Sequence, residues 1–338
     1  MKVLYHDDND GRACAYAVQK LVVECHNAHF KPGESVEFLP MQYNIPFDAG
    51  SVEDDEYVYM LDFSLPVERF DEVLQVTPNI TWIDHHESAM YKYVEVCKKH
   101  GERFTTLGVQ RVGVGACVLT WLYFSPHYML QLRRIDDNID HGLNPHLGLN
   151  VPQAFKLISD RDVWRFDYPD TPLFYAGSMC YDTHPLSDFW REVTEPPFAN
   201  PRVEEVIDAG VNVDSYRERA CSEAEAVNGF DVYLLAESGA QLRARALNTY
   251  PTSSESFGPS DFSEYDILMP FYFTTDGFVC SMYSQTVDVS KLAVGLGGGG
   301  HTYAAGFTTK VFPFVRDAAG AWVVDESSIR EAAGLGGG

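Results

Sequence analysis

The 338-residue sequence has few basic residues for its size. Only 25 Lys and Arg residues stand against 49 Asp and Glu residues, which gives a formal net charge of −24. Proteins that coat long nucleic acids through bulk electrostatics need a basic surface. The composition therefore argues against that class, whereas a short anionic substrate held in a crevice by metals or a few basic residues remains compatible with it.

The chain also lacks long hydrophobic runs and paired cysteines. No apolar run approaches the roughly 20 residues that span a bilayer, and the first residues read as a strand rather than as a signal peptide. We therefore expect a cytoplasmic protein with no membrane partner. The seven cysteines are scattered and never form a CxxC pair, which favours free thiols over disulfides or a zinc ribbon: Cys14, Cys25, Cys97, Cys117, Cys180, Cys221 and Cys280.

Hydrophobic residues make up 45% of the chain and aromatic residues 13%, which is enough to bury a core in each of two domains. Strand-like and helical runs alternate over residues 1–190, and this predicts an α/β domain with a parallel sheet and helices on both faces. Residues 191–230 are predicted to form a helical linker. Strand-like runs over residues 231–330 predict a smaller α/β domain with a mixed sheet.

Three strand-like runs of the first domain end in Asp or His residues. Residues 3–5 run into His6, Asp8 and Asp10; residues 57–61 run into Asp62; and residues 80–83 run into Asp84, His85 and His86. In an open α/β sheet the ligand crevice lies outside the carboxyl ends of the strands, so these side chains should meet. Such a group repels itself unless cations neutralise it. The pattern predicts a site for hard divalent metals.

Each of these clusters has a simpler explanation when it is taken alone, because Asp-rich loops are usually turns and a lone Asp often caps a helix. Their coincidence at three strand ends favours a site. A carboxylate such as Asp62, between two groups of ligands, can bridge two ions, and two-metal sites catalyse phosphoryl transfer. The mixed His and Asp set suits Mn²⁺, with Mg²⁺ or Co²⁺ as lesser options.

A run of four glycines at 297–300 precedes His301. Such runs are commonly flexible linkers. Here the run lies between a helix that Ser290 caps and a second apolar segment, 303–306, which reads as helical. This position favours a backbone nest at a helix N-terminus, whose N–H groups bind phosphate or carboxylate.

Five motifs, in this order along residues 1 to 310, resemble those of the DHH phosphoesterase superfamily. They are His6-x-Asp8-x-Asp10-Gly11, Asp62, Asp84-His85-His86, Asp160-Arg161-Asp162-x-Trp164 and Gly298-Gly299-Gly300-His301-x-x-Ala304-Ala305-Gly306. The resemblance implies a DHH catalytic domain over residues 1–190 and a DHH-associated substrate-binding domain over residues 231–330. It also implies an active site in the cleft between them, with two Mn²⁺ ions.

The resemblance further implies a role for each motif residue. One ion would be held by His6, Asp8 and Asp62. The other would be held by Asp10, Asp62, His85 and Asp160, with Asp162 as the alternative to Asp160. Asp84 would either be a ligand or orient the histidines, and the catalytic residues would be His86, Asp84 and Asp62. Substrate would be bound by Gly298, Gly299, Gly300, His301 and Arg161.

One position departs from the family pattern. Many relatives have an Arg in a Ser-x-Arg-Ser strand, whereas this chain has Tyr283 within Ser281-Met282-Tyr283-Ser284. A tyrosine can stack on a base but cannot form a bidentate pair with a phosphate. The candidate replacements for that Arg are Arg161, Arg111, Lys98 and Lys99.

The sequence therefore predicts a Mn²⁺-dependent phosphohydrolase that acts on short oligonucleotides, single-strand ends or nucleotide bisphosphates. One alternative is an inorganic pyrophosphatase or polyphosphatase, which the glycine and His301 motif disfavours. Another alternative is a non-catalytic nucleotide-binding module, which the intact set of acidic ligands disfavours.

Overall fold

The computed structural model describes residues 1–25, 35–42, 46–100, 107–195, 200–236, 238–250 and 252–335. The chain divides into two compact units, Met1–Asp214 (unit 1) and Ser215–Gly338 (unit 2). Helix α9, Pro201–Asn228, runs across this boundary, within the segment 191–230 that the sequence assigns to a linker. No helix in the described ranges is both long enough and apolar enough to cross a bilayer.

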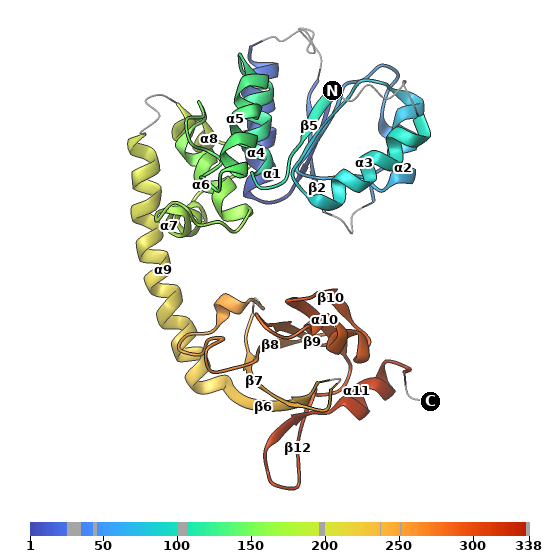
Figure 1. Ribbon diagram of the computed structural model, residues 1–338, viewed down its shortest axis with the longest axis vertical. Helices are drawn as coiled ribbons and strands as arrows, with labels where there is room; N and C mark the ends of the chain where they lie inside the picture. Colours follow the sequence, from blue (N-terminus) through green and yellow to red (C-terminus); the bar gives the residue numbers. More distant parts are fainter. Residues whose placement is uncertain are drawn as a thin grey trace. The chain divides into compact units, whose positions relative to one another are not determined.

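A parallel five-stranded sheet is the framework of unit 1 (Figure 1). Its strand order is β2-β1-β3-β4-β5, and every neighbouring pair runs parallel. The strands are β1 Lys2–His6, β2 Glu37–Met41, β3 Val58–Leu61, β4 Ile80–Asp84 and β5 Leu107–Gln110. The predicted α/β class with a parallel sheet is confirmed.

Helices cover both faces of the sheet, as the sequence predicts. Helices α2 and α3 lie on one face, and α1 and α4 lie on the other (Figure 1). Successive strand residues point to opposite faces: Met60 packs in the core beneath α2, and Leu61 packs in the core beneath α1 and α4. The helices are α1 Asn9–Val18, which continues as a π-helical turn over Gln19–Val23, α2 Val67–Val76, α3 Glu87–His100, α4 Ala116–Tyr123, α5 Tyr128–Asp140, α6 Gln153–Asp162, α7 Thr171–Ser178 and α8 Asp188–Thr194.

The order of the strands determines where a site can form. From β1 the chain passes to β2 on one side and then to β3 on the other side. A crevice opens at such a switch point, outside the carboxyl ends of the strands. The residues that follow β1 and β3 therefore flank this crevice, and the residues that follow β4 lie next to them.

The first turn of α1 packs tightly against the end of β1. Asp8 is the N-cap residue, and its Oδ1 accepts the N–H of Gly11 at 2.9 Å. A Cβ atom at Gly11 would lie 2.1 Å from the carbonyl oxygen of His6. Only glycine therefore allows the helix to start so close to the strand that precedes it.

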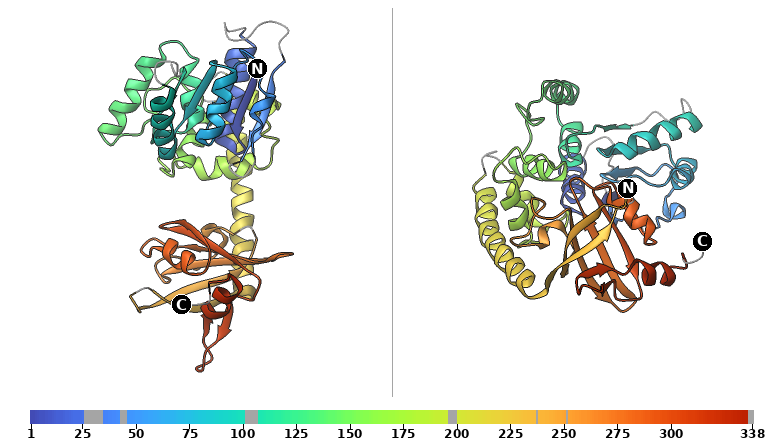
Figure 2. Two further views of the ribbon diagram at one scale, coloured as in Figure 1. Left: turned by 90° about the vertical axis from the view of Figure 1, so that its right-hand side faces the viewer. Right: turned by 60° about the horizontal axis from the view of Figure 1, so that its bottom comes forward.

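A mixed eight-stranded sheet forms most of unit 2 (Figure 2). Its order is β10-β11-β9-β8-β7-β6-β13-β12, with parallel pairs at β7–β8 and β6–β13. The strands are β6 Gly229–Leu235, β7 Gln241–Asn248, β8 Ile267–Thr274, β9 Gly277–Tyr283, β10 Gly299–His301, β11 Ala304–Thr309, β12 Phe314–Arg316 and β13 Trp322–Val324. The helices α10, Val289–Gly295, and α11, Glu326–Ala332, accompany the sheet and contribute to its core. The predicted mixed sheet is confirmed.

The glycine run of unit 2 does not begin a helix. It follows the end of α10, where Gly297 has a left-handed φ of 84° and the N–H of Gly298 donates to the carbonyl of Ala293 at 2.8 Å. This is a helix C-terminus, where glycine is preferred because it has no Cβ. Residues 299–301 then form β10, paired with the start of β11. The predicted nest at a helix N-terminus and the predicted helix over 303–306 are both wrong.

The close approach of α1 to β1 predicts the effect of Gly11→Ala. The added methyl group meets backbone that cannot move away, so the free energy of unfolding should fall by about 3 kcal/mol. Chemical denaturation followed by circular dichroism measures the loss. The matched control is Gly295→Ala, where the added Cβ would meet no described atom within 4 Å beyond its chain neighbours and its own helix backbone, and the change should stay below about 1 kcal/mol. A Gly11→Ala protein as stable as the parent would contradict this packing.

Candidate metal centre

Side chains from three strand ends meet at one edge of the unit 1 sheet. β1 ends at His6, and the chain then enters α1 with Asp8 as the cap and Asp10 in the first turn. β3 ends just before Asp62, and β4 ends at Asp84, which His85 and His86 follow. Three sets of residues each bring their potential metal-ligand atoms within 4.8 Å of one another. The sets are His6, Asp8 and Asp62; Asp62, His85 and His86; and Asp10, His85 and Asp162.

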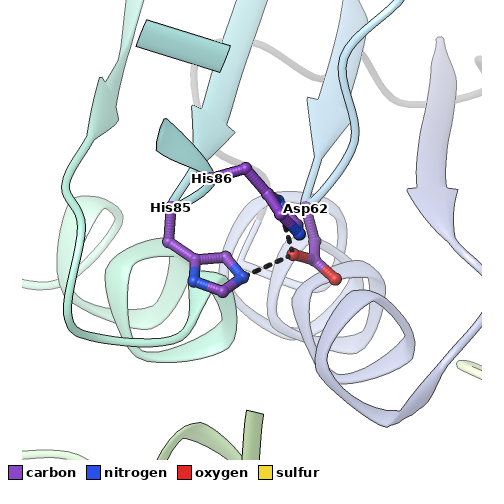
Figure 3. Close-up of side chains that lie close together, drawn as sticks. All are labelled: Asp62, His85 and His86. Atoms are coloured by element: carbon purple, nitrogen blue, oxygen red, sulfur yellow. Dashed lines mark ion pairs between the residues drawn. The ribbon is translucent and has the colours of Figure 1, made fainter. Parts of the chain in front are cut away.

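Asp62 lies at the centre of the cluster. It is 1% exposed and has a left-handed φ of 54°. Its Oδ2 lies 3.7 Å from His6 Nδ1, and its Oδ1 lies 3.2 Å from His85 Nε2, as the lower dashed line of Figure 3 marks. Neither carboxylate oxygen has a hydrogen-bond partner within the described residues. A buried carboxylate without hydrogen bonds is costly, and a cation between its neighbours would compensate for that cost.

The first set of ligands occupies the β1 side of Asp62. Oδ2 of Asp8 lies 2.6 Å from His6 Nδ1, and its Oδ1 accepts the Gly11 N–H. The cap thus fixes the Asp8 carboxylate next to the imidazole. The Asp62 and Asp8 carboxylates raise the pKa of His6 from 6.5 to about 10. Without a metal, a proton on His6 therefore supplies the positive charge on this side.

The second set of ligands occupies the opposite side of Asp62. Nε2 of His85 lies 2.9 Å from Asp162 Oδ2 and 3.9 Å from Asp10 Oδ2. Two backbone N–H groups at the start of α4 hold Asp10: Ala116 donates at 2.6 Å and Cys117 at 2.9 Å. The partial positive charge of a helix N-terminus thus faces this buried carboxylate. Asp62 belongs to the first set and adjoins the second through His85 Nε2, 3.2 Å from its Oδ1, which is the position that a bridging ligand requires.

The electrostatics of the second set also call for a cation. Burial raises the pKa of Asp10 well above its usual value, and the negative charges of Asp62 and Asp162 add to this rise. Burial also raises the pKa of Asp62 despite the opposing influence of His6 and His85. Burial alone would lower the pKa of His85, but Asp162 and Asp62 outweigh burial and raise it to about 11.

The ligand atoms of the three sets are imidazole nitrogens and carboxylate oxygens. This donor set fits Mn²⁺, Mg²⁺ or Co²⁺. The oxygens of Asp62, which lack hydrogen bonds within the described residues, would gain from coordination. The residues that the structure brings together therefore fit a pair of divalent cations.

Asp84 lies beside the cluster and contacts the two histidines that follow it. Its Oδ1 accepts the backbone N–H groups of His85 at 2.8 Å and His86 at 3.1 Å, and it lies 2.8 Å from His86 Nδ1. Because this oxygen is fully engaged and Asp84 is absent from all three ligand sets, the geometry favours the orienting role over the expected ligand role. This hydrogen bond turns the ring of His86 so that Nδ1 faces Asp84.

The structure also distinguishes the two acids of the fourth motif. The carboxylate of the expected ligand, Asp160, is hydrogen-bonded to the loop that follows α6. Its oxygens accept the N–H of Asp167 at 2.9 Å, the N–H of Tyr168 at 3.2 Å and the hydroxyl of Thr171 at 2.6 Å. It is Asp162 whose carboxylate reaches His85. The geometry therefore favours Asp162, the alternative that the sequence left open, over Asp160 as the metal ligand.

A pocket with a volume of about 480 Å³ adjoins the cluster. The expected substrate-binding residue Arg161 lines it, whereas Gly298, Gly299, Gly300 and His301 lie in unit 2, where their role stays a prediction. Sequence reasoning missed several lining residues because they belong to no metal-ligand pattern, although Trp164 stands within the fourth motif. The pocket is lined by Asp7, Asp8, Asn9, Asp10, Arg12, Ile158, Arg161, Asp162, Trp164, Tyr175, Ser178, Met179, Tyr181 and Thr183.

No family model matches the chain. A curated relative, "Uncharacterized protein R106" of Acanthamoeba polyphaga mimivirus, is 24% identical over 300 residues, which cover 85% of this chain and 58% of that protein. The chain thus spans little more than half the length of this relative.

Solved structures of DHH proteins are among those that this chain resembles in fold. The DHH domain of a member of the s1p family of ribosomal proteins matches 91% of this chain and 82% of its own, with 14% identity and a TM-score of 0.49. The match to exonuclease RecJ bound to manganese covers 91% of this chain and 85% of the RecJ chain, with 11% identity and a TM-score of 0.45. The match to the pGpG-specific phosphodiesterase PggH from Vibrio cholerae covers 92% of this chain and 93% of the PggH chain, with 11% identity and a TM-score of 0.39.

The raised histidine pKa values predict how pH changes the stability of the metal-free protein. Since the pKa is about 10 for His6 and about 11 for His85, against 6.5 for an unperturbed histidine, the folded state binds more protons than the unfolded state near neutral pH. The contribution of these groups to the unfolding free energy should therefore fall as pH rises from 7 to 8.5. Added Mg²⁺ or Mn²⁺ should raise the melting temperature more at pH 8.5 than at pH 7, because it replaces those protons.

Thermal melts of protein treated with EDTA, and of the same protein with either metal, measure both effects. The control is His85→Asn, which should flatten the pH dependence. A melting temperature that neither metal changes at either pH would contradict the metal site.

The two acids of the fourth motif should differ when each is replaced by asparagine. Asp162→Asn should lower the affinity for Mn²⁺ by at least about tenfold, because it removes a charge beside His85. Asp160→Asn should largely keep the affinity and lower the unfolding free energy by about 1–3 kcal/mol, because it disrupts buried hydrogen bonds. Isothermal titration calorimetry and denaturant unfolding separate these effects. The reverse pattern would restore Asp160 as the ligand.

Proposed function

We propose that this protein is a metal-dependent phosphohydrolase of the DHH kind, which hydrolyses phosphoester bonds of short nucleotide substrates with two Mn²⁺ ions. The observation that carries the proposal is the buried carboxylate of Asp62. It lies between His6 and His85, and neither of its oxygens has a hydrogen-bond partner among the described residues. A carboxylate shared by two ligand sets is the feature expected of a two-metal hydrolase.

Each ion would have its own set of protein ligands. His6, Asp8 and Asp62 would hold one ion, and Asp10, Asp62, His85 and Asp162 would hold the other. When bound, a pair of such ions supplies positive charge to a phosphate and lowers the pKa of nearby water, so that hydrolysis becomes possible near neutral pH. These ligands would also position the substrate phosphate at the carboxyl ends of β1, β3 and β4.

His86 is placed to stabilise negative charge on the phosphate. Its Nδ1 faces the Asp84 carboxylate at 2.8 Å, and this carboxylate raises the pKa of His86. The ring is half-exposed, so its Nε2 can donate from the protonated ring to a substrate oxygen. Asp84 thereby acts as a positioning residue, and His86 would act as the hydrogen-bond donor to the charge that develops in the transition state.

The charges of the pocket explain why substrate binding should require metal. Four aspartates line the pocket and would repel a phosphate: Asp7, Asp8, Asp10 and Asp162. The arginines in the lining are Arg12 and Arg161, and Arg12 already pairs with Asp7 at 2.9 Å. Cations at the cluster would reverse the sign of the local field. A short substrate that fits the pocket is also compatible with the acidic composition of the chain as a whole.

The predicted role of unit 2 is part of the same proposal. Gly299, Gly300 and His301 are exposed on β10, at one edge of the mixed sheet. The backbone there and the imidazole of His301 would bind a phosphate or a terminal nucleotide of the substrate. Tyr283, on β9, donates its hydroxyl to the carbonyl of Thr252 at 3.1 Å, so its ring has a fixed place in this unit.

A substrate screen with Asp62→Asn as the inactive variant tests the proposed function. Dinucleotides, short RNA, single-stranded DNA, a nucleotide bisphosphate and pyrophosphate are each incubated with Mn²⁺. We expect release of mononucleotide or phosphate from at least one nucleotide substrate, and a loss of at least about 100-fold in Asp62→Asn, because the shared ligand is weakened.

The control for this screen is Asp208→Asn, the same substitution at an exposed position on α9, and it should leave turnover unchanged. Hydrolysis of pyrophosphate alone would favour the pyrophosphatase alternative. Binding of nucleotides without turnover of any substrate would favour a binding module.

A further inference from the structure

We infer that Trp164, backed by Arg161, is a stacking platform for the nucleobase adjoining the phosphate that the metal cluster holds. The inference rests on the proposed function and makes it more specific, because it assigns to the pocket of unit 1 a base-dependent subsite. The substrate class that follows is a nucleotide or short oligonucleotide whose base lies beside the reacting phosphate. Inorganic pyrophosphate and polyphosphate would lack the group that this subsite recognises.

Trp164 differs from the other tryptophans of the chain. Trp82 and Trp190 are buried, and Trp121 and Trp322 are partly buried, whereas Trp164 is 63% exposed and lines the pocket beside the metal cluster. A large aromatic ring gains free energy from burial, so an exposed ring in a polar pocket contributes little to the core. Its position in the pocket suits a ligand that covers it.

The ring of Trp164 has one face occupied and the other available. The Cζ atom of Arg161 lies 4.3 Å from the Trp164 ring centroid and 4.8 Å from that of Tyr175. The ring of Phe166 meets Trp164 edge to face, with centroids 5.5 Å apart. Because these contacts leave 63% of Trp164 exposed, a flat ligand can stack on its second face. Arginine and aromatic rings form such platforms for bases in single-strand-binding proteins.

The backbone that carries this platform is strained. Trp164 has a φ of 53° and Phe166 a φ of 55°. Left-handed backbone is rare for bulky residues, and it persists only where the surrounding structure enforces it. Two strained aromatic residues in one short loop, both at least partly exposed, are the kind of outlier that accompanies ligand binding more often than core packing.

Asp160 enforces this backbone. Its carboxylate accepts the N–H groups of Asp167 and Tyr168 and the hydroxyl of Thr171, which follow the two aromatic residues. Its carbonyl accepts the N–H of Arg165 at 3.0 Å. The 0% exposed Asp160 therefore anchors the loop from both its main chain and its side chain. The platform is held in place before any ligand binds, which lowers the entropy cost of binding.

The platform lies close to the metal cluster. Asp162, which contacts His85, is two residues before Trp164, so the two Cα atoms are at most about 7.6 Å apart. Both residues line the same pocket. A base on Trp164 and a phosphate at the cluster can therefore belong to one nucleotide or to adjoining nucleotides.

Steady-state kinetics of the 338-residue protein with Mn²⁺ tests the inference. The substrates are a dinucleotide and an abasic analogue with the same sugar-phosphate backbone. Trp164→Ala should raise KM for the dinucleotide about 5- to 150-fold, the range that corresponds to the loss of one base stack. Trp164→Ala should leave KM for the abasic analogue unchanged. Trp164→Phe, which keeps an aromatic face, should recover most of the loss.

The matched control is Tyr216→Ala, which removes an exposed aromatic ring of α9 that is not among the pocket-lining residues. It should leave KM for both substrates unchanged. Equal KM values for wild type and Trp164→Ala on the dinucleotide would overturn the platform while leaving the proposed function intact. An equal rise of KM for the dinucleotide and the abasic analogue would also overturn it, because the effect would then be independent of the base.

A second readout does not depend on turnover. A non-hydrolysable phosphorothioate dinucleotide is titrated into the protein with Mg²⁺, and tryptophan fluorescence is followed. Base-dependent quenching that disappears in Trp164→Phe would support the platform even if the wild-type protein hydrolysed none of the substrates. Absence of quenching at concentrations where calorimetry shows that the dinucleotide is bound would overturn the platform.

Discussion

The structure of unit 1 depends on one buried negative charge. Asp62 lies at the end of a central strand with both carboxylate oxygens removed from solvent and without hydrogen-bond partners in the described part of the chain. An uncompensated buried charge is among the most costly features a fold can contain. The imidazoles of His6 and His85 compensate for it when they are protonated, and divalent cations would compensate for it more completely. The arrangement of the neighbouring residues follows from this requirement.

Helix starts supply the second part of this arrangement. Asp8 caps α1, and Asp10 accepts two N–H groups from the first residues of α4. Each carboxylate is thereby fixed in position by backbone donors, yet each oxygen keeps acceptor capacity that faces the cluster, because a carboxylate oxygen has two lone pairs. Gly11 is necessary for the same reason, since only a residue without a Cβ lets α1 begin beside the carbonyl of His6. The first motif is therefore a structural unit as well as a set of ligands.

The sequence predicts the parallel sheet and the convergence of its strand ends, because three separate apolar runs each end in His or Asp. It could not choose between Asp160 and Asp162, since both lie at the end of one helix and only the packing of α6 decides which one faces His85. It assigned Gly298–His301 to a helix start. In the structure residues 299–301 form a strand because β10 pairs with β11, and such pairing depends on tertiary context more than on the propensity of the residues themselves. It gave Trp164 no role, because an exposed aromatic ring is recognised only from its surroundings.

Residues two positions apart on an α-helix point about 160° away from each other, because the helix turns once every 3.6 residues. At the end of α6, the side chain of Asp162 therefore contacts the metal cluster. The side chain of Asp160 instead forms hydrogen bonds with the loop that carries Trp164 and Phe166. One turn of helix thus fixes the position of a candidate metal ligand and the position of the proposed base platform together. The distance between phosphate and base would then be set by the rigid helix end and not by the loop. A substrate would then have to satisfy both positions at once.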